Sequence, residues 1–500
     1  MARGGVGWFG PAPMSSGPVA GEDVLKPEPA DVLRLGRRAL RGVIRAARAD
    51  LAPTLRRRLL DHLGPAAPSA PVVEESWRMY DHVNVQTGLD AWLAEPGREH
   101  EIVGVTNFHH REFGIAELMA PGTGSEPWGL RAGNLATVNV PCGPDGAVRA
   151  CVECALYLVR EADRRAALLL RGPDPHGPRQ GVSLQVVSDP EGWAGSIAAD
   201  VRRLALELNV FRGQVVSFGG DVFGPGQALL HFHRRPHLDR RGLVLPPGVL
   251  ETIERQVVGV RRHRAALLAG GQHLKRGLLL YGPPGTGKTH TVRYLLANTP
   301  EVTAVQLTGS ALHLIAEACS VARTLAPSVV VVEDVDLIAE DRGMYPGQHP
   351  MLFQLLNEMD GLAEDADVAF VLTTNRADLL EPALAARPGR VDQAVELRLP
   401  DAEGRRALLD LYRGGLVVDD ADLDRMAEAT EGVTASFLKE LLRRAAVLAA
   451  DAATDGAVSV TVRGEHLDRA LAELRDTGNA MTRVLLGGRH LTPVPAPDAS

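Results

Sequence analysis

The feature that most constrains the fold of this 500-residue chain is an apolar run joined to a helical segment by a glycine-rich loop. The run Gly277–Tyr281 predicts a buried strand, and the helical segment covers His290–Leu296. Between them residues 282–289 read GPPGTGKT, with the spacing G-x-x-x-x-G-K-T. A strand, a glycine-rich turn and a helix in this order predict one unit of a parallel α/β sheet with an anion-binding loop at its edge.

The residue types of this loop suit the phosphates of a nucleotide. Glycines let backbone N–H groups curl around an anion, and the helix that follows directs its partial positive end toward it. Lys288 supplies a flexible point charge for the β- and γ-phosphates, and the Thr289 hydroxyl is a ligand for Mg²⁺. We expect the nucleotide to be bound by Gly282, Pro283, Pro284, Gly285, Thr286, Gly287, Lys288, Thr289 and His290.

Lysine is scarce in this chain, which adds weight to Lys288. It occurs at only four positions among 54 lysines and arginines. A bulky guanidinium does not replace an ammonium in a tight phosphate-binding loop. The lysine therefore persists at residue 288 in a chain otherwise tilted toward arginine.

Further apolar runs predict a five-stranded parallel sheet around this unit. Near-continuous apolar strands of this kind are typical of strands covered on both faces. The four additional strands are expected at Val302–Leu307, Val329–Val332, Val368–Leu372 and Gln393–Leu399.

Polar residues at the ends of these strands predict the catalytic groups. Glu333 and Asp334 follow the third strand, where carboxylates beside a phosphate-binding loop hold Mg²⁺ and orient the attacking water. Asn375 follows the fourth strand and can hydrogen-bond the γ-phosphate or the water. Two arginines, Arg387 and Arg390, come just before the fifth strand.

Together these motifs resemble the ATPase module of the AAA family over about Leu245 to Gly478. The matching segments are YGPPGTGKT (281–289), VVVVEDVD (329–336), LLNEMDGL (355–362), TTNRADLLEPAL (373–384) and RPGRVD (387–392). The resemblance implies a P-loop NTPase fold with a large domain at 245–399 and a small helical lid at 400–478. It further implies ATP and Mg²⁺ as cofactors, a ring that is usually hexameric, and ATP bound between subunits.

The same resemblance implies roles for individual residues. Arg387 and Arg390 would be arginine fingers acting on the γ-phosphate of the neighbouring subunit, and Asn375 would be the sensor. The family's usual Asp-Glu order is reversed here, so Glu333 takes the Mg²⁺ side together with Thr289, and Asp334 activates water. Asp is one methylene shorter than Glu, so slow hydrolysis is one expectation of this reversal.

Two other departures concern how a substrate would be handled. Members that thread polypeptides carry an aromatic residue in a loop after the second strand, but residues 310–326 contain no Phe, Tyr or Trp. Leu312, Leu314 or Ile315 could supply a weak apolar grip, although the segment is more simply a helix. After the module there is no H-E-x-x-H, the metal-binding motif of the membrane-bound AAA metalloproteases.

The remainder of the chain divides by composition. Residues 1–30 are expected to be disordered, 76–240 to form a separate α/β or α+β recognition domain, and 479–500 to be a flexible tail. Residues 31–64 are helical, broken at Pro53, and hold nine arginines. This stretch is either a basic arm for an acidic partner or, as we favour, a solvated face.

Cysteines, histidines and charge exclude some classes of protein and disfavour others. The pair Cys151-x-x-Cys154 lacks a second pair at zinc-binding spacing, and His109–His110 and His231-x-His233 lack a partner motif, so structural roles are favoured. Four cysteines are too few for a disulfide scaffold, no apolar run spans a membrane, and a cytoplasmic location is expected. A net charge of −8 and 4% aromatic residues disfavour nucleic acid as a partner without excluding it.

The leading hypothesis is an AAA ATPase that hydrolyses ATP in a ring to remodel a macromolecular partner, most simply a protein. The alternative is a slow-hydrolysing, ATP-dependent switch or scaffold that threads no polypeptide. The sequence of residues 76–240 does not identify the partner.

Overall fold

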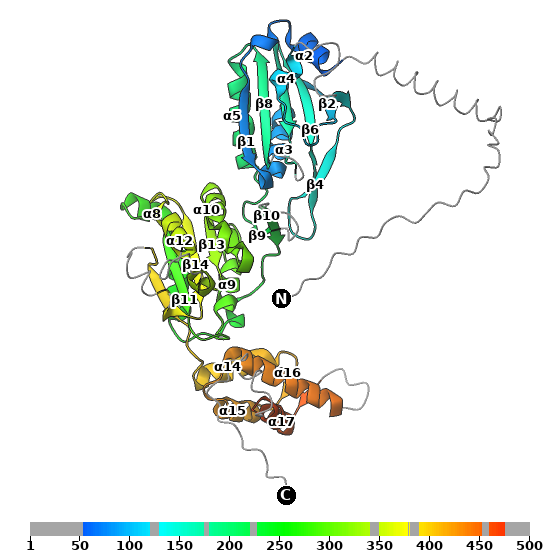
Figure 1. Cartoon of the computed structure of the whole chain (residues 1–500). Helices are drawn as coiled ribbons and strands as arrows, with labels where there is room; N and C mark the ends of the chain where they lie inside the picture. Colours follow the sequence, from blue (N-terminus) through cyan, green and yellow to red (C-terminus); the bar gives the residue numbers. More distant parts are fainter. Residues whose placement is uncertain are drawn as a thin grey trace, which may run out of the picture.

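A computed structural model describes residues 54–120, 130–174, 180–220, 228–340, 350–378, 380, 390–452 and 460–475. The predictions for 1–30, for 31–53 and for the tail after 475 lie outside these ranges. Within them three bodies follow one another along the chain (Figure 1). No helix in the described ranges is long and apolar enough to cross a bilayer.

The N-terminal body is built on a six-stranded antiparallel sheet in the order β1-β8-β7-β6-β2-β3. The sequence left α/β or α+β open, and the all-antiparallel pairing makes this body α+β. Its strands are β1 (Val73–Arg78), β2 (Arg98–Thr106), β3 (Arg131–Gly133), β6 (Cys154–Glu161), β7 (Arg164–Arg171) and β8 (Gly181–Asp189). A separate two-stranded hairpin pairs β4 (Thr137–Pro141) with β5 (Val148–Val152).

Helices cover both faces of this sheet, which explains why β6 and β7 are apolar along most of their length. One face packs against α3 (His82–Leu93) and α5 (Trp193–Glu207), with Trp92 and Trp193 in the shared core. The other packs against α2 (Leu55–Leu63) and α4 (Ile115–Met119). Short 3₁₀ turns lie at η1 (Ala67–Ser69) and η2 (Met79–Asp81).

The arginines of α2 make contacts within the chain. Arg56 donates to the Met119 carbonyl at 3.1 Å, Arg58 pairs with Glu101 at 2.6 Å, and Arg57 lies 3.6 Å from Asp61. Thr54 caps the helix through the Arg57 N–H, one residue after Pro53. At the described end of the basic stretch, Arg57 is therefore solvated as the favoured interpretation expects, while Arg56 and Arg58 also make contacts within the chain.

The second body is a mostly parallel sheet in the order β10-β9-β12-β13-β14-β11-β15. The five expected strands are present as β11 (Arg276–Tyr281), β12 (Thr303–Leu307), β13 (Ser328–Val332), β14 (Val368–Thr374) and β15 (Gln393–Glu396). They pair in parallel, as the apolar runs predicted.

The prediction of five strands nevertheless missed two strands of this sheet. β9 (Val215–Gly220) joins the edge in parallel with β12, and β10 (Ala228–His233) pairs antiparallel with β9. The expected recognition domain at 76–240 therefore ends too late, because residues 215–233 belong to the sheet of the second body. An edge strand can be supplied by any segment that reaches it, so local sequence pattern does not reveal its owner.

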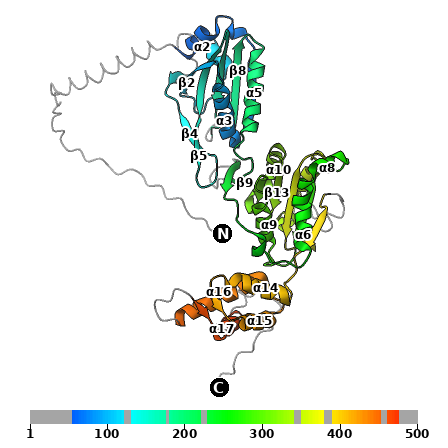
Figure 2. The same cartoon turned by 180° about the vertical axis from the view of Figure 1, so that it is seen from behind.

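Helices lie on both faces of this sheet (Figure 2). They are α6 (Val249–Glu254), α7 (Val260–Arg262), α8 (Arg264–Ala269), α9 (Lys288–Ala297), α10 (Ile315–Thr324), α11 (Val335–Glu340) and α12 (Pro350–Asp360). A π-helical turn, η5 (Arg255–Gly259), joins α6 to α7, and 3₁₀ turns lie at η4 (Arg240–Gly242) and η6 (Gly309–Leu314).

The segment after β12 is helical, as expected, and this affects the search for a substrate grip. Leu312 is 3% exposed and Ile315 is 1% exposed, and both belong to the core under the sheet. The suggestion that these two side chains contact a substrate was therefore wrong, because their apolar surface is already used in packing.

The third body is a small helical domain. It comprises α14 (Ala402–Arg413), α15 (Asp420–Ala429), α16 (Ala435–Ala452) and α17 (Gly464–Arg475), with a short parallel pair, β16 (Val417–Val418) and β17 (Thr461–Val462). Its own core contains Leu409, Met426, Phe437 and Leu467. Val244, from the segment before α6, packs against that core and links it to the second body.

Candidate nucleotide site

The glycine-rich loop leaves the carboxyl end of β11 and enters α9, as the sequence predicted. Gly282 has φ +144°, and a Cβ there would lie 2.3 Å from the Leu397 carbonyl oxygen. Gly287 has φ +101° at the N-cap of α9. Both positions require glycine, one for close backbone approach and one for the left-handed turn that starts the helix.

Lys288 is the buried cation of the loop, with 7% of its surface exposed. Its Nζ donates to the carbonyls of Gly282 at 2.8 Å and Pro283 at 2.9 Å. Burial lowers the pKa of Lys288 to about 8, while the charges of Asp334 and Asp336 act in the opposite direction. The ammonium is thus held inside the loop, where an anionic ligand would stabilise its charge.

Thr289 and Glu333 come together at the base of the loop. The Thr289 hydroxyl donates to Glu333 Oε2 at 2.9 Å, although the two residues are 44 positions apart. Glu333 follows β13 directly, and its N–H donates to the Leu307 carbonyl at the end of β12. A hydroxyl and a carboxylate in contact are oxygen donors of the kind Mg²⁺ takes beside nucleotide phosphates, so this pair fits the expected cation.

Asp334 occupies an unusual backbone position beside this pair. Its φ is +54°, a left-handed value uncommon for residues other than glycine, although aspartate and asparagine adopt it more often than most. The Asp334 N–H donates to the Thr373 hydroxyl at 3.1 Å, and Asn375 Nδ2 donates to Asp334 Oδ1 at 3.4 Å. The two residues predicted to activate water and to sense the γ-phosphate are therefore in direct contact.

A third carboxylate, missing from the predicted site residues, fixes this contact. Asp336 Oδ1 accepts hydrogen bonds from the Thr374 hydroxyl at 2.9 Å and from the Asn375 N–H at 3.3 Å. Thr373 and Thr374 are both buried at the end of β14. The signal for these residues was their position, because polar residues at the carboxyl ends of adjacent parallel strands meet at one edge.

The small helical domain reaches the same loop. The Ser436 N–H donates to the Gly285 carbonyl at 3.4 Å, and a Cβ on Gly285 would lie 2.9 Å from the Thr434 hydroxyl oxygen. His290, expected to bind the nucleotide, contacts the Gly242 carbonyl through Nε2 at 2.9 Å. The loop is therefore bordered by the start of α16 and by the segment that precedes α6.

The two predicted arginines are not part of this cluster. Arg387 lies outside the described residues. Arg390 is 8% exposed and forms an ion pair with Asp360, in which its Nε donates to Oδ1 at 2.9 Å. Arg390 precedes β15, which runs parallel to β11. It therefore lies near the amino-terminal ends of these strands, whereas the loop leaves the carboxyl end of β11.

Of the cysteines and histidines singled out earlier, Cys151, Cys154, His231 and His233 lie on strands, whereas His109 and His110 are exposed in a turn. All four cysteines are free, and Cys151 and Cys154 are buried on β5 and β6. His233 Nε2 contacts the Ser217 hydroxyl at 2.6 Å across β9 and β10. In the part of the chain that the structure describes, no three His, Cys, Asp or Glu side chains gather as a metal site.

Comparison with known proteins agrees with this geometry. The model of the "ATPase family associated with various cellular activities (AAA)" matches residues 278–399, which contain the loop and the strand ends around it. The ATP-dependent zinc metalloprotease FtsH 4 of Sphaerobacter thermophilus is 33% identical over 301 residues, covering 57% of this chain and 43% of that protein.

Two further relatives show the same partial overlap. Protein SAV of Sulfolobus acidocaldarius is 37% identical over 186 residues, 35% of this chain and 24% of its own length. The ATP-dependent zinc metalloprotease YME1L of Drosophila melanogaster is 34% identical over 242 residues, 46% of this chain and 30% of its own length. The chain thus spans less than half the length of each of these relatives.

Proposed function

The chain carries an AAA ATPase domain, and from this premise we propose that it binds and hydrolyses ATP in a ring to remodel a protein partner. The observation that carries the proposal is the meeting of Thr289 with Glu333 beside Asp334 and Asn375. We place the protein in the cytoplasm, in keeping with its four free cysteines. The N-terminal body is the candidate for partner recognition.

The residues divide the chemistry of phosphoryl transfer between them. Lys288 exchanges its two carbonyl contacts for oxygens of the β- and γ-phosphates. Thr289 and Glu333 would hold Mg²⁺, which would neutralise charge on the phosphate oxygens. Asp334 orients the attacking water and accepts its proton. Asn375 hydrogen-bonds the Asp334 carboxylate and the γ-phosphate and so keeps the two groups aligned. Asp336 positions Asn375 through its backbone N–H.

The arginines complete the site across a subunit boundary. Arg390 precedes β15 and so lies near the amino-terminal ends of the strands, away from its own loop, which supports a role toward a neighbouring subunit. For that role its ion pair with Asp360 has to open or turn toward the neighbour. Arg387 is proposed as the second finger by its place in the motif RPGRVD.

A slow-hydrolysing switch remains the second candidate, and two observations favour it. The Asp334 carboxylate is shorter than Glu and is already bonded to Asn375, while Leu312 and Ile315 are buried and unable to grip a substrate. In this case ATP binding itself, with little turnover, would set the state of the ring.

Steady-state phosphate release separates the two candidates. Remodelling by hydrolysis predicts Mg²⁺-dependent turnover that is lost in Lys288→Ala and in Arg387→Ala. Arg398→Ala is the matched control, since Arg398 is exposed on the surface and pairs there with nearby Glu396. ATP binding without turnover in the assembled wild type contradicts the remodelling candidate.

Two designed variants sharpen this experiment. Exchanging the pair, Glu333→Asp with Asp334→Glu, raises turnover if the reversed order slows hydrolysis. Mixing Lys288→Ala subunits with Arg390→Ala subunits restores turnover at mixed interfaces if the arginine acts in trans. For the partner, Asp334→Asn would hold it in the ATP state for capture.

A further inference from the structure

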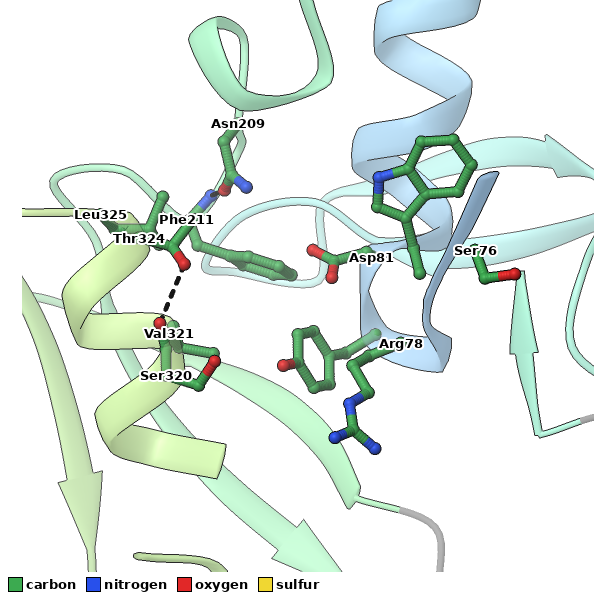
Figure 3. Close-up of a pocket in the computed structure, with 11 residues that line it drawn as sticks. Ser76, Arg78, Asp81, Asn209, Phe211, Ser320, Val321, Thr324 and Leu325 are labelled. Atoms are coloured by element: carbon green, nitrogen blue, oxygen red, sulfur yellow. Dashed lines mark hydrogen bonds between the residues drawn. The ribbon is translucent and has the colours of Figure 1, made fainter. Parts of the chain in front are cut away.

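A cavity of about 360 Å³ lies at the junction of the N-terminal body and the AAA domain (Figure 3). Trp77 at the end of β1, with Tyr80 and Asp81 of η2, forms one wall. Phe211, from the segment between α5 and β9, and Ser320 of α10 close the other side. The cavity is therefore built from both bodies and is separate from the nucleotide loop.

Three aromatic rings line this cavity. The Tyr80 and Phe211 ring centroids are 6.4 Å apart in an edge-to-face arrangement, and Tyr80 makes a similar contact with Phe218 at 5.9 Å. Trp77 already carries the Arg202 guanidinium 5.7 Å from its ring. Clusters of aromatic rings attract organic cations through the negative faces of their π-systems.

The same cavity contains a carboxylate without an ion-pair partner. Among the described residues no cation lies within 4 Å of Asp81, whose hydrogen-bond donor is Asn84 Nδ2 at 3.0 Å. Burial raises the pKa of Asp81 to about 6, and the nearby charge of Arg78 lowers it only in part. The guanidinium of Arg78 extends away from the carboxylate, which faces Phe211 (Figure 3).

The carboxylate is held in this place by the joint between the two bodies. Asn84 donates to Asp81 and also accepts the Val210 N–H at 2.9 Å. A charge-compensating ligand would contact both the N-terminal body and α10 of the AAA domain. Desolvated carboxylates are costly unless such a counter-charge is present.

We propose that this cavity binds an organic cation, an ammonium or guanidinium group, between Asp81 and the rings of Trp77, Tyr80 and Phe211. The group can come from a free amine or from a lysine or arginine side chain of a polypeptide. Both sources share the same chemistry, and the proposal does not depend on the rate of ATP hydrolysis.

Isothermal titration of the full chain at constant ionic strength tests this site. The probes are tetramethylammonium and spermidine as free amines, and acetyl-Gly-Lys-Gly-amide and acetyl-Gly-Arg-Gly-amide as side-chain sources. The neutral comparisons are tert-butanol and the norleucine peptide. We expect saturable binding of at least one cation, with at least tenfold weaker binding of both neutral comparisons. The set of cationic probes that binds more tightly, free amines or peptides, identifies the source.

Variants from opposite walls make the result independent of one substitution. Asp81→Asn, which keeps an acceptor for Asn84, is expected to weaken cation binding at least tenfold. Ser320→Lys, at an exposed position of α10, is expected to block the site with its own ammonium. Asp200→Asn, on the surface of α5, is the control and should bind as the wild type does. Equal binding by wild type and Asp81→Asn, or no saturable binding of any cation, overturns the proposal.

Discussion

The described part of the chain holds two sheets of more than two strands, and the polar residues around them make different kinds of contact. In the seven-stranded sheet, Glu333, Asp334 and Asn375 follow strands that run in the same direction, and their side chains meet beside one loop. In the N-terminal body, His62 of α2 bonds to the carbonyls of Val159 and Ala166 in the six-stranded antiparallel sheet, and His82 of α3 bonds to the carbonyl of Val152 in the β4–β5 hairpin. The polar side chains at the strand ends of the first sheet meet at one site, whereas these buried histidines of the N-terminal body bond to backbone carbonyls of neighbouring strands.

This difference follows from strand direction. Parallel strands end at a common edge, where unpaired backbone and short loops leave room for a ligand. Neighbouring antiparallel strands end at opposite edges, so residues at their ends are dispersed. The candidate recognition function of the N-terminal body is therefore better sought where it adjoins the AAA domain than on its sheet.

The largest expected effect is on stability. The core of the N-terminal body and the core of the AAA domain should unfold independently of each other. Phe370 in the parallel sheet and Trp92 in the N-terminal body are 1% and 0% exposed. Truncating either one to Ala should cost about 3–5 kcal/mol of folding free energy. Trp92→Ala should destabilise the N-terminal body, and Phe370→Ala the AAA domain, in thermal unfolding followed with and without ATP–Mg²⁺.

ATP should stabilise only the unit that binds it, so only one of the two transitions should shift with nucleotide. Trp92→Phe is the control, because it keeps a ring and removes an indole N–H that has no partner among the described residues. A single transition that shifts as a whole with ATP would show that the two sheets unfold together. The two sheets would then differ in the chemistry of their polar residues but not in their stability.

The next effect is a loss of ATP turnover, which depends on the loop beside the parallel sheet. Lys288→Ala removes the cation of the loop and should lower turnover about 10²–10³-fold, the usual cost of losing one charge-stabilising group. Lys275→Ala, two residues after His273 and outside the loop, should behave as wild type. Retained turnover in Lys288→Ala would place the chemistry elsewhere in the chain.

A smaller effect is expected at the joint between the two bodies. Asn84→Ala removes the donor to Asp81 and leaves the Val210 N–H without its acceptor. Leaving a buried donor unpaired costs about 1–3 kcal/mol. Denaturant unfolding should show this loss, while Thr87→Val, which removes a hydroxyl bonded within α3, should cost less. Equal losses would mean that Asn84 does not join the bodies.

The smallest effect compares buried basic side chains on helices of the two bodies. Burial lowers the pKa values of His62, His82 and Lys288, but only Lys288 lies where a ligand can restore its charge. Since the pKa of Lys288 is about 8, its amine becomes neutral above that pH, and ATP affinity should fall by about tenfold per pH unit there. Below pH 8 the contribution of the Lys288 charge to ATP affinity should be constant.

Calorimetry in buffers of different ionisation enthalpy should detect proton uptake on ATP binding between about pH 8 and 9.5. The permanently charged variant Lys288→Arg is the control and should bind more weakly but without this pH dependence. An affinity that stays flat to pH 10 would show that the lysine keeps its proton without the nucleotide.

The sequence was most informative where function depends on neighbours along the chain. The strand, loop and helix around Lys288 are local, and each was placed within a residue or two. The five parallel strands were visible because burial on both faces makes each of them apolar throughout. The edge strands β9 and β10 were assigned to the wrong body, because nothing in a strand's own pattern states which sheet it will join.

By itself, then, the sequence determined the phosphate-binding loop and the order of groups around it, since backbone geometry and residue type are fixed over a few positions. The tertiary structure alone decided that Asp336 would hold Asn375, that Arg390 would pair with Asp360, and that Asp81 would face Phe211. Those contacts join residues 30 or more positions apart. They exist only after the strands and bodies have packed, because packing and not spacing brings such side chains within reach.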